Sequence, residues 1–320
     1  MSKINILAVI GPTASGKSEL AVKLAKQFDG EIISADSRQI YKNLNIGTGK
    51  VEGRWERLSK AKNLSTVFIY KNIPHYAIDI ANPQTVYSVS KYKTLVQKII
   101  LEIFNRGKLP ILCGGTAQYI DTVVYNQDIP QVKPNWILRK KLAKYSTQEL
   151  SEQLKELDPE RAKTIDQKNP VRLIRALEII HTTGKPVPNL NIKNQKSNLY
   201  NAFWIGIETD QAELYKKIEK RLKARLKDGM IEEVKNLHSP SKTKARLSWK
   251  RLESFGLEYK YISLYLQNKL TYEEMETQLF TAIKQYSKRQ MTWWKRNPKI
   301  NWLPVDSKKI NVSVAKFLKK

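Results

Sequence analysis

The chain has 320 residues and carries 57 Lys and Arg against 30 Asp and Glu, a formal net charge of +27. Such an excess is unusual for an enzyme of small metabolites and indicates a polyanionic partner, with nucleic acid favoured over a membrane surface. A lysine-rich or thermophilic proteome is the other explanation of this charge. The absence of a long apolar run argues against a membrane-spanning helix, and the single Cys113 excludes an internal disulfide and a cysteine zinc site.

The first predicted element is a buried strand over 4–10, rich in Ile and Val, which leads into a glycine loop and a helix. It begins so early that no room is left for a signal peptide, and we expect a cytoplasmic location. The loop has the G-x-x-x-x-G-K-S spacing of a P-loop, whose backbone N–H groups bind a di- or triphosphate. Lys17 is expected to meet the outer phosphate oxygens, and the Ser18 hydroxyl to ligate Mg²⁺. The predicted diphosphate- or nucleotide-binding residues of this loop are Gly11, Pro12, Thr13, Ala14, Ser15, Gly16, Lys17 and Ser18.

A second short strand is predicted over 31–34, and Asp36 follows it directly. Because ligands collect at the carboxyl ends of the strands of an open parallel sheet, Asp36 should face the same cleft as Lys17. A helix cap and an outer-sphere partner of Mg²⁺ are the alternative roles of this carboxylate. The charged segment 51–72 is interpreted as an insertion without an assigned role.

A third strand-like run spans 74–80, and a helix with apolar residues at helical spacing is predicted over 89–106. The next buried strand, over 109–113, runs into Gly-Gly-Thr and should place the hydroxyl of Thr116 beside the cleft. A Walker-B strand would normally end in Asp, and none of these strands does, which argues against a motor ATPase.

The composition changes from about residue 128 to 198, where prolines punctuate short, charged helices such as those predicted over 139–145 and 147–157. A further helix over 169–178 carries Arg172 and Arg175 on one face. Contact with phosphate and a solvated or salt-bridged face are the two open interpretations of this arginine pair. The region is predicted to be a helical insertion in the α/β core.

The remaining predicted elements are a strand over 203–207, a helix over 211–227 and a last helix over 272–294. The last helix ends in basic residues interleaved with Trp293 and Trp294, which suit either a nucleic-acid surface or the core. We therefore predict an α/β fold with a P-loop NTPase-like parallel sheet. Its catalytic core would comprise 1–127 and 200–320, and the helical insertion domain would comprise 128–199.

Several of these pieces occur together in one known family. The sequence resembles the tRNA dimethylallyltransferases, which prenylate N6 of the adenosine beside the anticodon. The resemblance runs in family order over nearly the whole chain, and its Asp-Ser-x-x-Ile-Tyr and Gly-Gly-Thr elements are specific to that family. The matching pieces are 11–18, 34–41, 47–48, His75, Asp79, 114–116, Tyr119, 169–178, 229–234 and 288–293. No zinc-finger extension is present, as in the bacterial type.

The resemblance implies a reaction and its residues. The P-loop would hold dimethylallyl diphosphate with Mg²⁺ as cofactor, Asp36 would be the general base, and Thr116 would contact the target adenosine. Arg221 would lie near the pyrophosphate. The tRNA anticodon stem-loop would be bound by the insertion domain and by the site, without a membrane and by a monomer. The expected tRNA-binding residues are Asp36, Ser37, Arg38, Gln39, Thr116, Arg139, Arg172 and Arg175.

Two other functions fit parts of the sequence. A P-loop kinase of a nucleotide or another small substrate would bring arginines from a lid over the γ-phosphate, but it has no evident use for a charge of +27. A non-catalytic RNA-binding ATPase would not need Asp36 and Thr116 in their places.

Overall fold

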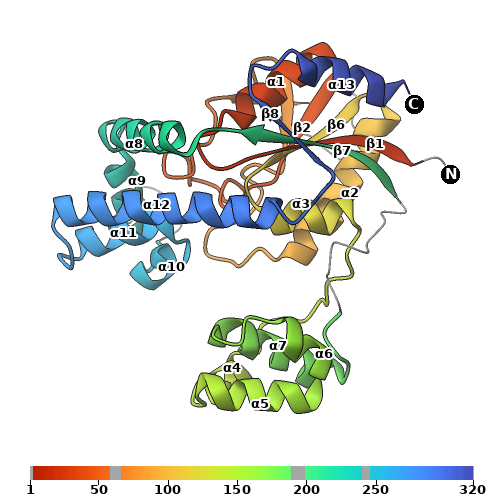
Figure 1. Cartoon of the computed structure of the whole chain (residues 1–320). Coiled ribbons are helices and arrows are strands. Elements are labelled where there is room, and N and C mark those ends of the chain that lie inside the picture. The colour runs from red at the N-terminus through yellow and green to blue at the C-terminus, as the bar shows by residue number, and fades with distance from the viewer. Residues whose placement is uncertain (1–2, 58–65, 189–198, 240–245, 320) are drawn as a thin grey trace. The chain divides into compact units, whose positions relative to one another are not determined.

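The computed structural model describes residues 3–57, 66–188, 199–239 and 246–319. The chain forms two compact units, one of residues 1–126 and 195–320 and one of residues 127–194 (Figure 1). The predicted insertion, 128–199, overlaps the second unit over most of its length. Each unit has its own buried apolar cluster.

The first unit is built on an eight-stranded sheet in the order β3-β4-β5-β2-β6-β1-β7-β8. The six strands from β5 to β8 in this order run parallel, while β3 and β4 pair antiparallel at one edge. The strands are β1 (Ile4–Ile10), β2 (Gly30–Ser34), β3 (Arg54–Arg57), β4 (Thr66–Tyr70), β5 (Ile73–Tyr76), β6 (Leu109–Gly114), β7 (Tyr200–Glu208) and β8 (Ile300–Pro304). The predicted α/β class is confirmed, and the sheet is mixed rather than wholly parallel.

The segment 51–72, to which the sequence assigned no role, supplies the antiparallel edge of the sheet. Residues 54–57 and 66–70 form β3 and β4, and residues 58–65 lie outside the described part of the chain. A two-residue turn joins β4 to β5, with positive φ at both Lys71 and Asn72, as a tight hairpin requires. The predicted strand over 74–80 is too long, because Ala77 and Asp79 adopt positive φ and end the extended backbone after Tyr76.

Helices cover both faces of the sheet (Figure 1). On one face, α1 (Lys17–Gln27) and α13 (Lys309–Leu318) bury apolar side chains against β1, β6 and β7. On the other face lie α2 (Val89–Asn105) and α3 (Ala117–Val124), whose Tyr92 and Tyr119 stack with ring centroids 3.9 Å apart. This layering explains why β1 is a continuous apolar run, since both of its faces are buried.

The helices between β7 and β8 form a helical layer of the same unit. They are α8 (Gln211–Lys227), α9 (Met230–His238), α10 (Trp249–Ser254), α11 (Leu257–Leu266) and α12 (Tyr272–Trp294). A capping box of Thr271 and Glu274 fixes the start of α12. Trp294 is fully buried and Trp293 donates its indole N–H to Asp121 at 2.6 Å, so both indoles serve packing between α12 and the rest of the unit.

The second unit contains α4 (Trp136–Leu142), α5 (Thr147–Leu157), α6 (Pro159–Thr164) and α7 (Pro170–Thr183). The predicted bounds of α5 are confirmed, whereas α4 begins and ends three residues earlier than predicted. The reason is local, because Asn135 caps α4 by accepting the N–H of Leu138. Helix α7 continues beyond the predicted 178 and ends at Gly184, whose φ of 64° is left-handed.

Candidate active site

The P-loop joins the carboxyl end of β1 to the N-terminus of α1. Gly16 adopts a φ of 89° just before the helix, a conformation that costs other residues a steric clash. The Lys17 ammonium donates to the carbonyl of Pro12 at 3.1 Å, so this side chain folds back along its own loop. Burial lowers the pKa of Lys17, and the nearby Arg221 acts in the same direction. The loop and Arg221 therefore concentrate positive charge where a phosphate group could bind.

Asp36 follows β2, the strand that lies beyond β6 from the P-loop strand β1. Its Oδ1 accepts the N–H groups of Arg38 at 2.8 Å and Gln39 at 3.2 Å. Among the residues that the structure describes, none donates a hydrogen bond to its other oxygen, Oδ2. One oxygen thus caps a turn after β2 rather than the helix that one alternative assumed, and the other remains able to accept a proton.

Thr116 follows β6 and lies against the Asp36 loop. Its Oγ1 accepts the N–H of Ser37 at 3.0 Å and lies 3.3 Å from the Ser37 hydroxyl oxygen. The loops after β2 and β6 are thereby joined by side-chain and backbone contacts, as expected for strands whose carboxyl ends meet at one edge of a sheet.

A cavity of about 270 Å³ opens between the P-loop, the loop after β2 and the helices α8, α11 and α12. Thr13 of the P-loop, Asp36 and Ser37 line it together with Tyr286. Its charged lining consists of four arginines and two carboxylates: Arg38, Arg221, Arg225, Arg289, Asp36 and Glu258. The imbalance makes the cavity electropositive and suited to an anion.

Two of these four arginines, Arg221 and Arg225, lie one helical turn apart on α8. Arg225 pairs with Glu258 at 3.3 Å, whereas Arg221 forms no ion pair with any described residue. Partial desolvation and the neighbouring Arg225 lower the pKa of Arg221 to about 10, so this guanidinium stays charged at neutral pH. The predicted placement of Arg221 beside the P-loop residues agrees with the lining of the cavity. Arg225 and Glu258 were not recognised from the sequence, and the spacing of 221 and 225 on one helix was the only available signal.

Other predicted residues make contacts inside the protein. Arg38 lines the cavity but donates its Nε–H to the carbonyl of Phe255 at 2.6 Å. Gln39 turns toward the next loop and donates to the carbonyls of Thr48 and Gly49, at 3.3 Å each. The contacts of these two residues with tRNA stay predictions.

Glu233 of α9 was also not predicted from the sequence. It fixes the loop 45–47, which borders the cavity. Its carboxylate accepts the N–H groups of Asn45, Ile46 and Gly47 at 2.7–3.1 Å and the hydroxyl of Tyr259 at 2.8 Å. The segment 229–234 contains this residue, but no pattern in the sequence indicates that its carboxylate caps a distant loop.

The predicted tRNA-binding arginines of the second unit are held by acidic partners. Arg139 donates to both oxygens of Glu178, at 2.8 and 2.7 Å, and Arg175 donates to the same carboxylate. Arg172 lies nearer the solvent, 3.7 Å from Asp166 and 59% exposed. Of the pair for which the sequence left a solvated or salt-bridged face open, Arg175 is salt-bridged and Arg172 is mostly solvated. Contact of Arg139, Arg172 and Arg175 with tRNA stays a prediction.

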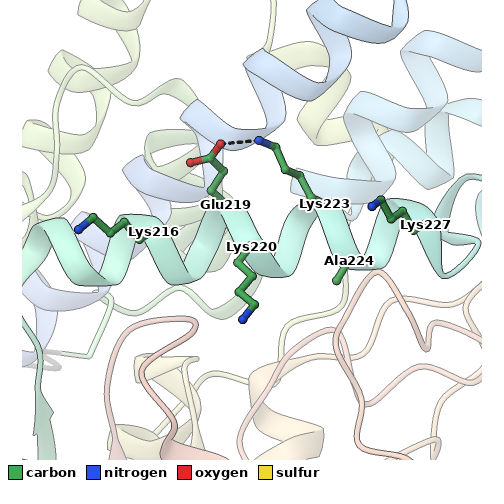
Figure 2. A pocket seen from close by; sticks show the side chains of 6 residues that line it. All are labelled: Lys216, Glu219, Lys220, Lys223, Ala224 and Lys227. Atoms are coloured by element: carbon green, nitrogen blue, oxygen red, sulfur yellow. Dashed lines mark hydrogen bonds and ion pairs between the residues drawn. The ribbon is translucent and has the colours of Figure 1, made fainter.

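A second, more open cavity of about 470 Å³ runs along α8 (Figure 2). Four lysines line it, and we call them the α8 lysine face: Lys216, Lys220, Lys223 and Lys227. Lys223 pairs with Glu219 at 2.7 Å, and Figure 2 shows Lys220 pointing away from that pair. At 3.6 residues per turn, this face lies roughly opposite Arg221 and Arg225 on the same helix.

The residues that could hold a metal ion are few. Among residues 3–57, 66–188, 199–239 and 246–319, no group of three His, Cys, Asp or Glu side chains is placed to bind one. Ser18 is exposed at the start of α1. Mg²⁺ commonly binds through one or two protein oxygens together with substrate phosphates, and Ser18 with the unpaired oxygen of Asp36 is compatible with that donor set. In the part of the chain that is described, no helix is long and apolar enough to cross a membrane.

Comparison with known proteins identifies the family. Residues 39–297 match the family model described as IPP transferase. The chain is 41% identical over 310 residues to tRNA dimethylallyltransferase 1 of Azobacteroides pseudotrichonymphae, covering 95% of this chain and 94% of that protein. It is 37% identical over 320 residues to the tRNA dimethylallyltransferase of Acetivibrio thermocellus, covering 98% and 96%.

A solved structure supports the same family assignment. The tRNA delta(2)-isopentenylpyrophosphate transferase of Staphylococcus epidermidis superposes with a TM-score of 0.67 at 31% identity, covering 99% of this chain and 100% of that one. The resemblance found in the motifs is thus confirmed over nearly the full length. The chain belongs to the IPP transferase family, the family of the tRNA dimethylallyltransferases.

Proposed function

We propose that this protein transfers a dimethylallyl group from dimethylallyl diphosphate to N6 of the adenosine beside the tRNA anticodon and releases pyrophosphate. The observation that carries the proposal is the electropositive cavity, in which Thr13 of the P-loop, Asp36 and Arg221 line one space. A diphosphate-binding loop and a carboxylate with a free oxygen are the two groups that this reaction needs.

The transfer forms a C–N bond and breaks a C–O bond. The exocyclic amine of adenine is a poor nucleophile, so its proton must leave as the bond to the allylic carbon forms. Oδ2 of Asp36 is unpaired among the described residues and would accept that proton. Thr116, on the loop after β6, accepts the N–H of Ser37 next to Asp36 and would contact the adenine.

The departing pyrophosphate develops negative charge on its oxygens. The P-loop amides, the Lys17 ammonium and the unpaired guanidinium of Arg221 would stabilise that charge. Ser18 would hold Mg²⁺, which supplies further neutralisation of the diphosphate when bound. These groups act on the leaving group, whereas Asp36 acts on the nucleophile.

The tRNA partner accounts for the charge of +27. The target base must leave its stack to enter a cavity, at a cost of a few kcal/mol, and contacts with the RNA backbone would offset that cost. The α8 lysine face and Arg172 are exposed basic groups in the two units that suit such contacts.

The direct test is incubation of the protein with unmodified tRNA and dimethylallyl diphosphate, followed by mass spectrometry of the tRNA. A prenyl group added to the adenosine beside the anticodon is the expected result. The kinase alternative predicts instead that ATP is consumed and that no prenyl group is transferred, and the family membership does not favour it.

Asp36→Asn separates the roles of the carboxylate. Asn retains an oxygen that can accept the N–H groups of Arg38 and Gln39, but it cannot take up a proton at neutral pH. Loss of a general base lowers the single-turnover rate by about 10²–10⁴ with little change in substrate binding. Partial recovery at high Mg²⁺ would indicate a metal partner instead. A change in melting temperature with normal turnover would indicate only a cap.

Lys17→Ala tests the other half of the site. Removing the mobile charge of the P-loop should greatly weaken binding of dimethylallyl diphosphate and leave tRNA binding nearly intact. Equilibrium titration with each substrate measures the two affinities, and an unchanged diphosphate affinity would contradict the P-loop assignment.

A further inference from the structure

Gln290 of α12 joins two loops that lie far apart in the sequence. The side chain is 5% exposed. Its Oε1 accepts the N–H of Thr13 in the P-loop at 2.9 Å, and its Nε2 donates to the carbonyl of Gly115 at 2.9 Å. Both ends of one amide are therefore used, each on the backbone of a different loop.

The local structure leaves space for this one side chain. A Cβ atom built on Gly115 would lie 2.3 Å from Nε2 of Gln290, so any larger residue would push the amide away. Because Gly115 has no side chain, the amide of Gln290 can reach its carbonyl. A glycine fits this position because of a close approach rather than because of its backbone angles.

The two loops would bind different reactants of the proposed reaction. Thr13 belongs to the loop that would hold the diphosphate, and its N–H points to Gln290. Gly115 precedes Thr116, which binds the N–H of Ser37 next to Asp36. Gln290 thus connects the leaving-group side of the cavity to the side of the base and the adenine.

We propose that Gln290 is a positioning residue that sets the distance between the P-loop and the loop of Thr116 during prenyl transfer. The inference rests on the proposed function. Transfer between two bound substrates depends on their mutual placement, and an error of about 1 Å is enough to lower a rate about 100-fold. A side chain that touches neither reacting atom nevertheless controls the rate through the two backbones that it holds.

Gln290→Met keeps an unbranched side chain of similar length and removes both hydrogen bonds. Ser287→Ala is the matched control, because Ser287 is one turn earlier on α12 and is also buried. Within the described part of the chain, its hydroxyl bonds only to the carbonyl of Lys284. We expect Gln290→Met to lower the single-turnover rate about 10- to 100-fold, with dissociation constants for both substrates within about threefold of wild type. Ser287→Ala should retain the wild-type rate.

Gln290→Glu gives a pH readout that a merely structural role would not produce. A protonated carboxyl can donate to Gly115 and accept from Thr13, whereas the ionised form has no donor for the carbonyl. The ratio of the Gln290→Glu rate to the wild-type rate should therefore fall as pH rises through the pKa of the new carboxyl. The ratio for Gln290→Met should not depend on pH.

Hydrogen exchange of the Thr13 amide measures the contact without substrates. Protection in wild type and in Ser287→Ala, with faster exchange in Gln290→Met, supports the proposal. Equal exchange in all three, a Gln290→Met rate within threefold of wild type, or a pH-independent ratio for Gln290→Glu would overturn it. A wild-type protein that transfers no prenyl group would overturn the proposed function itself, and the positioning role with it.

Discussion

Arginine pairs occur in both units of the molecule, in opposite electrostatic settings. In the second unit Arg139 and Arg175 share the carboxylate of Glu178, whose side chain is 0% exposed. Burial opposes ionisation of Glu178, but the hydrogen bonds from the two guanidinium groups outweigh it and lower its pKa to about 2. In the first unit Arg221 forms no ion pair with a described residue, and partial desolvation together with the neighbouring Arg225 lowers its pKa to about 10.

The presence or absence of a carboxylate partner distinguishes arginines that stabilise the fold from arginines that can bind a ligand. A guanidinium group that already shares a buried carboxylate would have to give up that partner to bind phosphate, and an unpaired buried carboxylate is costly. A guanidinium group without a carboxylate gains when an anion enters its cavity. We therefore infer that Arg221 serves the diphosphate, while Arg139 and Arg175 mainly hold the second unit together.

Among the tests of this comparison, the largest effect should come from Arg221→Ala. Removing an unpaired positive group that lines the proposed diphosphate cavity should lower kcat/KM by about 10²–10³, as for loss of one oxyanion-stabilising donor. Folding stability should change little, since no ion pair is lost. Steady-state prenyl transfer measures the effect. Lys220→Ala, one residue earlier on the outward face of α8, is the control and should retain kcat.

Glu178→Gln should instead act on the stability of the second unit. The neutral amide leaves two guanidinium groups without their charge partner and should destabilise the unit by about 2 kcal/mol. Amide hydrogen exchange in α4 and α7 measures this loss. Glu156→Gln, an exposed change on α5, should have no such effect. Faster prenyl transfer or unchanged protection in Glu178→Gln would contradict the comparison.

The same carboxylate predicts a pH dependence. The pKa of Glu178 is lowered from 4.5 to about 2 in the folded unit. A lowered carboxyl pKa contributes stability that is fully present above about pH 4.5 and is lost as pH falls toward 2. Hydrogen exchange in α7 should therefore accelerate across this window in wild type, and less so in Glu178→Gln.

Binding of tRNA should depend more on Arg172 than on its neighbours. Replacing Arg139, Arg172 and Arg175 together by Ala should weaken tRNA binding and lower its salt dependence by about one unit of slope for each lost phosphate contact. Arg172→Ala alone should reproduce most of the change in slope, since this side chain is 59% exposed. Titration over a range of salt concentrations measures the slopes, and an unaltered slope in the triple variant would mean that none of the three contacts phosphate.

The smallest effect should come from the α8 lysine face. Reversing the charge of Lys220 and Lys227 by substitution with Glu should reduce tRNA affinity a few-fold at low salt, with the difference shrinking as salt screens the charges. Turnover at saturating tRNA should stay at the wild-type level, because these side chains face away from the cavity that Asp36 and Arg221 line. An equal affinity for wild type and variant at low salt would remove this face from the tRNA-binding surface.

Local patterns in the sequence were sufficient for much of the fold. The P-loop, β1 and α1 follow from an apolar run, two glycines and helical spacing over adjacent residues. The bounds of α5, α8 and α12 follow from caps and apolar periodicity, which act within a few residues of the chain. The hairpin of β4 and β5 was missed because its turn, Lys71-Asn72, lacks the usual glycine.

The candidate site was predictable only in part. The position of Asp36 and Thr116 at strand ends follows from the rule that parallel strands end at one edge of the sheet. The contacts of Gln290 with Thr13 and Gly115 join residues separated by 277 and 175 positions, and no spacing rule reaches that far. The hydrogen bonds of Glu233 to the backbone of residues 45–47 could not be predicted for the same reason, because they also join distant parts of the sequence.

The sequence by itself determined the order of elements, the phosphate-binding loop and the strong positive charge, because each depends on neighbouring residues or on composition alone. Only the tertiary structure decided which charges are neutralised. Arg172 and Arg175 look alike in the sequence, three residues apart on one helix. Folding buries Glu178 beside Arg175 and leaves Arg172 59% exposed, because packing of α4 against α7 determines which side chains lose water.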